Sequence, residues 1–303
     1  MGILSYILQQ TINALSLGSI YALVAIGLSM VYGVLRLVNF AHGDLMMVAC
    51  YVSFFLVATG LHLGFIALLI ISIFIATLVG ILMERIAYRP VRGADEIITL
   101  LTSLAVSIFI ENIFVMFASP VPRSFRSVTP AFLNSVNRIS GGIVVPNIAI
   151  VIFGVTILLF ILLHLFVTRT KLGISMRATS EDLMAAQLSG ININIPIVTA
   201  FTIGSAIAGL AGILWAARIG QINPLMGFFP LLKSFVAVVI GGMGSLAGAI
   251  LGSYLLGFAE IFFIGFLPPV FSSYRDAFVF LLLIIVLLLR PSGIFGSTER
   301  EKV

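Results

Sequence analysis

Residues 39–44 read Asn-Phe-Ala-His-Gly-Asp and interrupt a region that is otherwise almost entirely apolar, between the stretches 8–33 and 44–60. Glycine lets the backbone turn, and Asn, His and Asp side chains can bond the backbone groups that a break sets free. Irregular backbone at membrane depth must be buried in protein or line a water-filled cavity. These six residues therefore predict a broken helix inside a membrane protein.

The composition supports this prediction. Of 303 residues, 61% are hydrophobic and 9% are charged, and the mean hydropathy is +1.24. A soluble domain is about 25% charged, so a cytosolic enzyme, a secreted domain and a disordered chain are excluded. The net charge of +5 fits cationic loops at the cytoplasmic membrane face better than a nucleic-acid partner. Cys50 is the one cysteine and cannot form an internal disulfide.

A membrane-spanning helix needs about 20 apolar residues. Eight stretches meet this length: 8–33, 44–60, 63–83, 96–118, 146–168, 195–217, 231–266 and 276–290. The seventh is too long for one span and is expected to split near residues 241–248. We therefore expect an all-α, polytopic transmembrane helical bundle of about eight spans with broken helices, forming one domain over residues 1–303.

Basic residues set the predicted orientation, because cytoplasmic loops are enriched in Lys and Arg. One side of the predicted bundle carries Arg36, the loops 84–95 and 169–194, and the tail from Arg290. The other side carries fewer: Arg123, Arg126, Arg138, Arg218, Lys233 and Arg275. We expect the first side to be cytoplasmic, with the N-terminus outside and the C-terminus inside.

A weak internal repeat is also predicted. His42-Gly43-Asp44-Leu45 aligns with Met243-Gly244-Ser245-Leu246, and the same offset aligns Arg89-Pro90 with Arg290-Pro291. Transporters often carry such symmetry, with interrupted segments at matching places in the two halves.

Two breaks are the candidate substrate pathway. The first comprises Asn39, His42, Gly43 and Asp44, and it has two interpretations: a structural turn with Asp44 as N-cap of the next helix, or direct contact with a transported molecule. The second comprises Gly241, Gly242, Gly244 and Ser245. The spacing of Gly244, Gly248 and Gly252 predicts one closely packed helix face, and Gly241 and Gly242 could instead form a hinge or line a cavity.

The loop 169–194 is the largest predicted cytoplasmic segment. Thr179 or Ser180 is expected to N-cap a short helix, with Glu181 and Asp182 in its first turn. Gly190 is a natural residue to follow the end of that helix. The helix could dock on a partner, or it could lie flat at the membrane interface.

The sequence gives no support for an enzyme. It contains no phosphate-binding G-x-x-x-x-G-K-[ST] loop, no G-x-S-x-G elbow and no H-E-x-x-H zinc motif. Arg218 and Lys233 either contact an external partner or are ordinary charges at span ends. Glu111 and Glu260 lie within spans, where they either pair inside the bundle or belong to the permeation route.

Taken together, these segments resemble the membrane permease subunit of branched-chain amino-acid ABC importers. The resemblance rests on residues 39–44, 84–92, 181–192, 241–245 and 291–296, in the expected order over nearly the whole chain. It implies a protein of the bacterial or archaeal plasma membrane that transports its substrate inward by alternating access. It also implies that this chain holds no cofactor or metal and that ATP binds to partner subunits.

The resemblance further implies a second homologous permease, two cytoplasmic ATPase subunits, an extracytoplasmic substrate-binding protein and contact with lipid, but no nucleic acid. The predicted ATPase-coupling residues are Glu181, Asp182, Ala185, Ala186 and Gly190. The broader importer pattern has Glu-Ala-Ala, three residues, then Gly, whereas Met184 here stands in place of the Glu.

Two alternatives stay open. Related permeases carry urea, short amides or other amino acids, and nothing in the sequence separates these substrates from Leu, Ile and Val. A stand-alone ion-coupled transporter or channel would use buried acids such as Asp44, Glu111 and Glu260. In the importer, we expect the spans to rock around a cavity bordered by both breaks.

Overall fold

The structure, a computed structural model, describes residues 2–61, 63–139 and 142–295. Within these ranges seven helical segments are long and apolar enough to cross a membrane. They are α1 (Ile3–Leu35), α3 (Phe65–Met83) with the turns that extend it to Val91, α4 (Glu96–Ala118), α6 (Asn147–Arg169), α9 (Asn194–Ile219), α11 (Leu246–Phe266) and α12 (Arg275–Leu289) with the turn that precedes it from Pro269. Two shorter apolar helices are α2 (His42–Ala58) and α10 (Phe228–Gly241). The predicted polytopic helical bundle is confirmed, and the stretch 231–266 divides as predicted.

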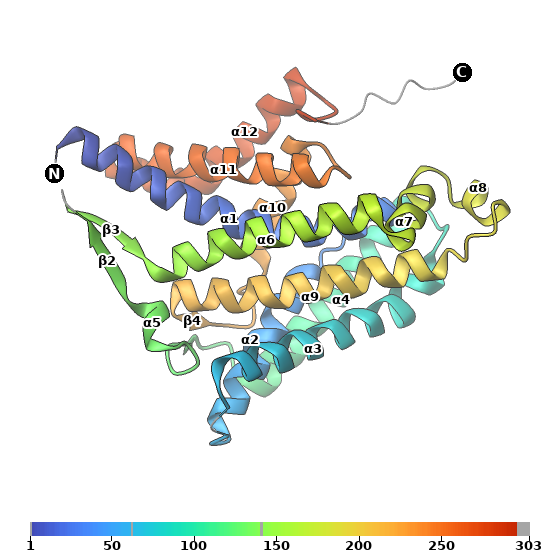
Figure 1. Cartoon of the computed structure of the whole chain (residues 1–303), viewed down its shortest axis with the longest axis horizontal. Helices are drawn as coiled ribbons and strands as arrows, with labels where there is room; N and C mark the ends of the chain where they lie inside the picture. The colour runs from blue at the N-terminus through green and yellow to red at the C-terminus, as the bar shows by residue number, and fades with distance from the viewer. Residues whose placement is uncertain (1, 62, 140–141, 296–303) are drawn as a thin grey trace.

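Short elements gather at the two ends of the bundle (Figure 1). One end carries α7 (Lys171–Glu181) and α8 (Leu183–Leu188). The other carries α5 (Ala131–Asn134) and two antiparallel strand pairs, β1 (Arg123–Ser124) with β4 (Gln221–Ile222) and β2 (Val136–Ile139) with β3 (Ile143–Pro146). The two predicted sides of the membrane are therefore separate ends of the molecule, and the end with α7 and α8 is the predicted cytoplasmic one.

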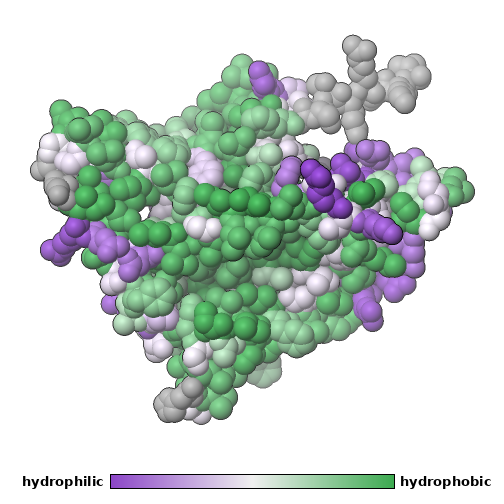
Figure 2. Space-filling model, in the orientation of Figure 1, coloured by the Kyte–Doolittle hydropathy of each residue, from purple (hydrophilic) through white to green (hydrophobic). Residues whose placement is uncertain are grey.

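An apolar surface covers the bundle between these ends (Figure 2). Large side chains such as Ile70, Phe74 and Phe109 are at least 60% exposed on α3 and α4. Such exposure would be unfavourable in water over so large an area, whereas lipid tails are as apolar as these side chains. The outer helices are therefore built to face lipid.

The centre of the bundle is a crossing of α1 and α9. Gly27 of α1 and Gly204 of α9 meet there, since a Cβ on Gly204 would fall 3.0 Å from the Gly27 carbonyl oxygen. Nearer the ends, Arg218 Nη1 donates to Ser16 Oγ at 2.9 Å, so the two helices are antiparallel. Small residues allow this close approach, and the resulting core contains most of α1 and α9.

The two halves of the bundle repeat each other in the same chain order but with opposite orientation, since α1 and α9 are antiparallel. α1 packs on α10 and α11 as α9 packs on α3 and α2, and α2 contacts α3 as α10 contacts α11. The repeat therefore matches α1–α4 with α9–α12. The register predicted from sequence is wrong, because His42–Leu45 opens α2 whereas Met243–Leu246 joins α10 to α11.

Both halves contain a segment that turns back into the bundle. His42 lies beside Gly27, although α1 continues to Leu35, so the chain returns by about 12 Å at 1.5 Å per helical residue. In the other half, α9 ends at Ile219 and Gly227 comes back to touch Gly43. The first turn of α2 and the residue before α10 therefore meet inside the bundle.

Candidate functional site

The polar side chains of residues 39–44 are buried around the start of α2. Asn39, His42 and Asp44 are each at most 2% exposed. Tyr88 donates its hydroxyl to Asn39 Oδ1 at 2.7 Å, and the backbone N–H of Phe40 donates to Ser103 Oγ at 2.5 Å. The end of the α3 segment and α4 therefore hold this break, which supports the interpretation of a structural turn.

Asp44 occupies the first turn of α2 and is not its N-cap, so that prediction is wrong. There the partial positive charge of the helix end favours a carboxylate. Asp44 accepts a hydrogen bond from Ser107 and lies near Glu111, while its Oδ2 has no partner among the described residues. Ser103 and Ser107 were not among the predicted site residues, although polar residues at 103, 107 and 111 mark one face of a span.

Gly43 allows the closest backbone approach in this region. A Cβ on Gly43 would fall 2.7 Å from the carbonyl oxygen of Gly227, and one on Gly227 would overlap the backbone of Gly43. On the other side of α2, the fully buried His42 ring lies against Gly27. The first break is therefore a packed junction of three chain segments.

The second break is a turn between α10 and α11. Gly242 and Gly244 have φ angles of 105° and 85°, a backbone region that favours glycine. Ser245 caps α11 by accepting from the Gly248 N–H at 3.0 Å. Gly248 and Gly252 pack closely on α10 as predicted, but the expectation that Gly244 shares their helix face is wrong, because it precedes α11.

A cavity of about 720 Å³ opens beside the second break. Its lining includes Tyr32, Glu181, Phe235, Gly244, Ser245 and Leu283. None of the residues 39–44 lines it. In this conformation the structure therefore does not bring the two breaks to the single cavity that the sequence predicts.

The segment 169–194 folds into two helices in place of one. Thr179 and Ser180 lie inside α7, so neither is the predicted cap. Asp182 caps α8, accepting from Met184 N at 2.8 Å and Ala185 N at 3.0 Å. Gly190 follows the end of α8 as predicted, with φ 83°.

The side chains of α8 divide into an inner and an outer set. Ala186 is 4% exposed, whereas Ala185 points outward. Met184 and Leu188 are 72% and 85% exposed, and they lie four residues apart, on the same side of the helix. The outer surface of α8 is therefore apolar although it lies at a polar end of the molecule.

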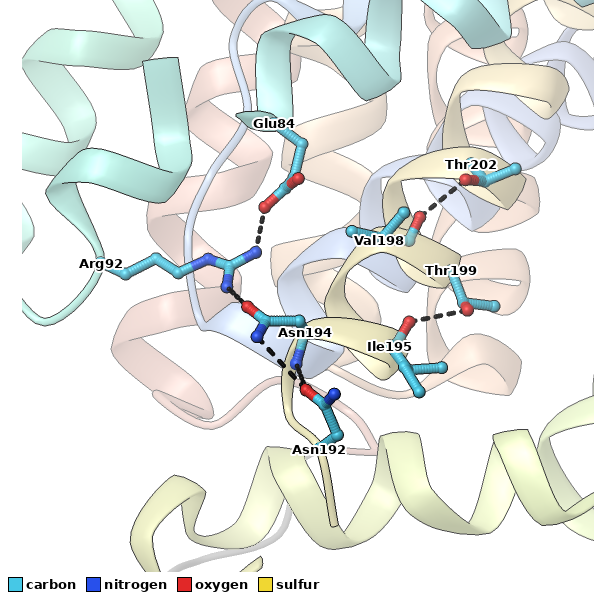
Figure 3. A network of polar contacts seen from close by, with 8 residues as sticks. All are labelled: Glu84, Arg92, Asn192, Asn194, Ile195, Val198, Thr199 and Thr202. Atoms are coloured by element: carbon cyan, nitrogen blue, oxygen red, sulfur yellow. Dashed lines mark hydrogen bonds and ion pairs between the residues drawn. The ribbon is translucent and has the colours of Figure 1, made fainter. Parts of the chain in front are cut away.

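A polar network that runs from the exposed Asn192 to the buried Glu84 joins the linker after α8 to the end of α3 (Figure 3). Arg92 donates through Nη2 to Glu84 Oε1 and through Nη1 to Asn194 Oδ1 at 2.7 Å. Asn194 Nδ2 and its backbone N–H both donate to Asn192 Oδ1 at 3.2 Å. Burial lowers the pKa of Arg92 from its ordinary value, and Glu84 opposes that shift.

A second ionic cluster lies toward the end of the bundle that carries the strands. Glu260 of α11 is fully buried and pairs with Lys233 of α10 at 2.7 Å and with Arg275 of α12. Tyr21 donates to its second oxygen at 2.9 Å, and Lys233 also pairs with Asp276 at 2.8 Å. Of the two interpretations for Glu260, the structure supports pairing inside the bundle.

A pocket of about 360 Å³ lies at the same end, between the end of α9 and the start of α6. Arg126 and Arg218 line it together with Leu133, Ile148 and Ile219. No carboxylate within the described ranges pairs with Arg218 at salt-bridge distance. The pocket therefore presents guanidinium groups beside an aliphatic wall.

The sequence profile of the family "Branched-chain amino acid transport system / permease component" matches residues 10–287. The chain belongs to this family. The match spans both breaks, the segment 169–194 and the two ionic networks.

Known members of the permease family align with nearly the whole chain. The chain is 40% identical to the high-affinity branched-chain amino acid transport system permease protein BraD of Pseudomonas aeruginosa, over 98% of both chains. It is 39% identical to LivH of Escherichia coli K12, also over 98% of both. It is 27% identical to LivM of the same strain, over 96% of this chain and 71% of LivM. No solved structure matches the chain.

Family membership confirms the resemblance found in the sequence. Together with the seven membrane-crossing segments, it makes the chain a multi-pass transport permease of the bacterial or archaeal plasma membrane.

Proposed function

We propose that this permease is the membrane subunit of an ABC importer that moves branched-chain amino acids inward, powered by ATP on separate subunits. Relatives that are 40% identical over 98% of the chain carry branched-chain amino acid transport in their names. No cofactor or metal is required in this chain. The structural observation that carries the proposal is the outer surface of α8.

The exposed Met184 and Leu188 suit α8 to docking on another protein. A contiguous exposed apolar patch is typical of a protein–protein or membrane interaction site. The predicted coupling residues support this surface: Asp182 caps α8, Ala186 is buried on its inner side and Gly190 follows its end. Glu181 and Ala185 lie at its edge, so an ATPase seated there would contact the whole segment.

The remaining partners follow from the two ends of the fold. Two permeases of one strain, LivH and LivM, are both similar to this chain, which supports pairing with a second homologous permease. A substrate-binding protein would dock at the strand-bearing end, where the pocket beside Arg126 and Arg218 could receive an acidic side chain. The cytoplasmic end would hold two ATPase subunits.

Transport by alternating access would use the two breaks. The contact of Gly43 with Gly227 closes the inside of the bundle, while Gly244 and Ser245 border an open cavity. Rocking of one half against the other would part the glycines and connect residues 39–44 to that cavity. We expect specificity to lie mainly in the binding protein.

Purification through a tag on this chain tests the proposal. The expected result is a complex with ATPase subunits. In proteoliposomes with the ATPase subunits facing the lumen, it should take up radiolabelled leucine only when ATP is inside and the binding protein is outside. Flux through the chain alone, driven by an ion gradient, would establish the stand-alone transporter instead. ATP-dependent uptake of urea or short amides, but not of leucine, would support the importer function with a different substrate.

A further inference from the structure

Arg92 is placed to connect the linker after α8 with the first break. The two outer nitrogens of its guanidinium bind different elements: Nη1 reaches Asn194 at the start of α9, and Nη2 reaches Glu84 at the end of α3 (Figure 3). Glu84 is fully buried and Arg92 is 17% exposed. A guanidinium fork can hold two such partners in fixed directions, which a lysine cannot do.

On one side, the connection runs back to α8 through a short, ordered linker. The N–H of Ile191 donates to the Ala186 carbonyl at 3.0 Å, so the linker is bonded to α8. Asn192 Oδ1 then accepts from the backbone and side chain of Asn194. A displacement of α8 is therefore transmitted to Asn194 through hydrogen bonds and only a few residues of chain.

On the other side, the connection runs through one turn of helix. Glu84 opens a π-helical turn that ends at Tyr88. Pro90 follows, and because proline has no N–H to donate to Ile86, the regular α-helix cannot continue through it. The Tyr88 hydroxyl donates to Asn39 at 2.7 Å, and its ring packs on Phe201 at 5.2 Å.

We infer that Arg92 is a positioning residue that couples movement of α8 to the first break, through Glu84, Tyr88 and Asn39. The inference rests on the proposed docking of an ATPase on α8. It adds a specific route by which that docking reaches the segment packed between Gly27, Gly227 and α4. Arg92 itself touches neither the ATPase surface of α8 nor the break.

The test measures coupling separately from assembly. The complex is purified through a tag on this chain, and leucine uptake per ATP hydrolysed is measured in proteoliposomes for R92Q, R92K, N194L and N194D. Arg89 lies in the same turn and is exposed, so R89Q is the matched control. For R92Q and N194L we expect uptake per ATP to fall by roughly 2- to 30-fold, the range for changes along a coupling route.

The conservative variants separate positioning from a merely structural role. N194D keeps the acceptor oxygen for Arg92 but loses the Nδ2 bond to Asn192, so it should lose less coupling than N194L. R92K keeps the charge but not the fork and should fall between R92Q and wild type. ATPase co-purification and elution as an intact complex should be unchanged throughout. If R92Q is poorly extracted from the membrane, N194L and N194D still test the bond between Arg92 and Asn194. Neither variant leaves the buried Glu84 without its partner Arg92.

Three results would overturn the inference: unchanged uptake per ATP in R92Q and N194L, equal loss in N194D and N194L, or an equal loss in R89Q. These differ from failure of the proposed function itself. If the wild-type chain neither binds an ATPase nor uses ATP, the proposed importer function is wrong. If the wild type and the variants all couple uptake to ATP equally well, only the route through Arg92 is wrong.

Discussion

Gly43 of α2 and Gly227 before α10 touch backbone to backbone, at the point where the two inverted halves of the permease meet. A Cβ on Gly43 would lie 2.7 Å from the Gly227 carbonyl oxygen and 3.2 Å from Leu231 Cβ. Each residue belongs to a segment that turns back into the bundle, so the contact joins these two returning segments. The size of these two side chains thus limits how closely the halves can pack.

Replacing Gly43 by alanine should destabilise the permease by about 1–3 kcal/mol, because a methyl group must be forced into a filled junction. The expected observation is a lower unfolding temperature in detergent and reduced leucine uptake. G64A is the matched control, since a methyl group on Gly64 would meet nothing within 4 Å and the φ angle there is −63°. A G43A chain as stable as G64A would contradict the packed junction.

Removing the Tyr88 hydroxyl should weaken the first break without changing the shape of the core. In Y88F the buried Asn39 Oδ1 loses its donor, and an unsatisfied buried polar group costs about 1–3 kcal/mol. We expect a lower unfolding temperature and slower uptake. Y274F, at an exposed tyrosine, should leave both unchanged. Equal behaviour of the two variants would show that the Tyr88–Asn39 bond does not hold the break.

Hydropathy alone predicted the spans closely, because lipid requires about 20 apolar residues and the chain contains few other apolar stretches. The ends of α4 match the predicted 96–118, and α10 and α11 separate at the predicted glycines. The turning back of residues 36–41 was not predictable in the same way. It depends on Gly27 and Gly227, which leave room for His42 and Gly43. These contacts join residues far apart in sequence.

The candidate site was predicted in part for similar reasons. Asn39, His42 and Asp44 were found because polar groups are rare within spans, but their partners Ser103 and Ser107 are small and inconspicuous in sequence. The cap of α8 was misplaced because Thr179, Ser180 and Asp182 can all accept from a helix N-terminus. Asp182 is the cap because α7 continues through Glu181, which leaves Thr179 and Ser180 inside α7.

The ionic cluster around Glu260 should be sensitive to loss of its buried member and tolerant at its rim. In E260Q, Lys233 and Arg275 remain without their shared carboxylate, and breaking a buried pair in this way costs about 3–5 kcal/mol. D276N removes an acid that is 52% exposed and should cost at most about 1 kcal/mol. The measurement is the folded fraction after detergent extraction, followed by thermal unfolding. Similar losses in both variants would mean that Glu260 is not the centre of the cluster.

The outer surface of α8 should bind the ATPase through Met184 and Leu188, since burying each would remove a largely exposed apolar side chain from water. L188E and M184E should therefore abolish ATPase co-purification while the permease still inserts and elutes as a folded protein. Ala186 is a poorer test than these two, because it is buried on the inner side of α8 and its replacement would disturb the helix itself. L61E adds the same charge at an exposed leucine between α2 and α3, and it should leave ATPase binding intact. Retention of the ATPase by L188E and M184E would place the docking surface elsewhere on the cytoplasmic end.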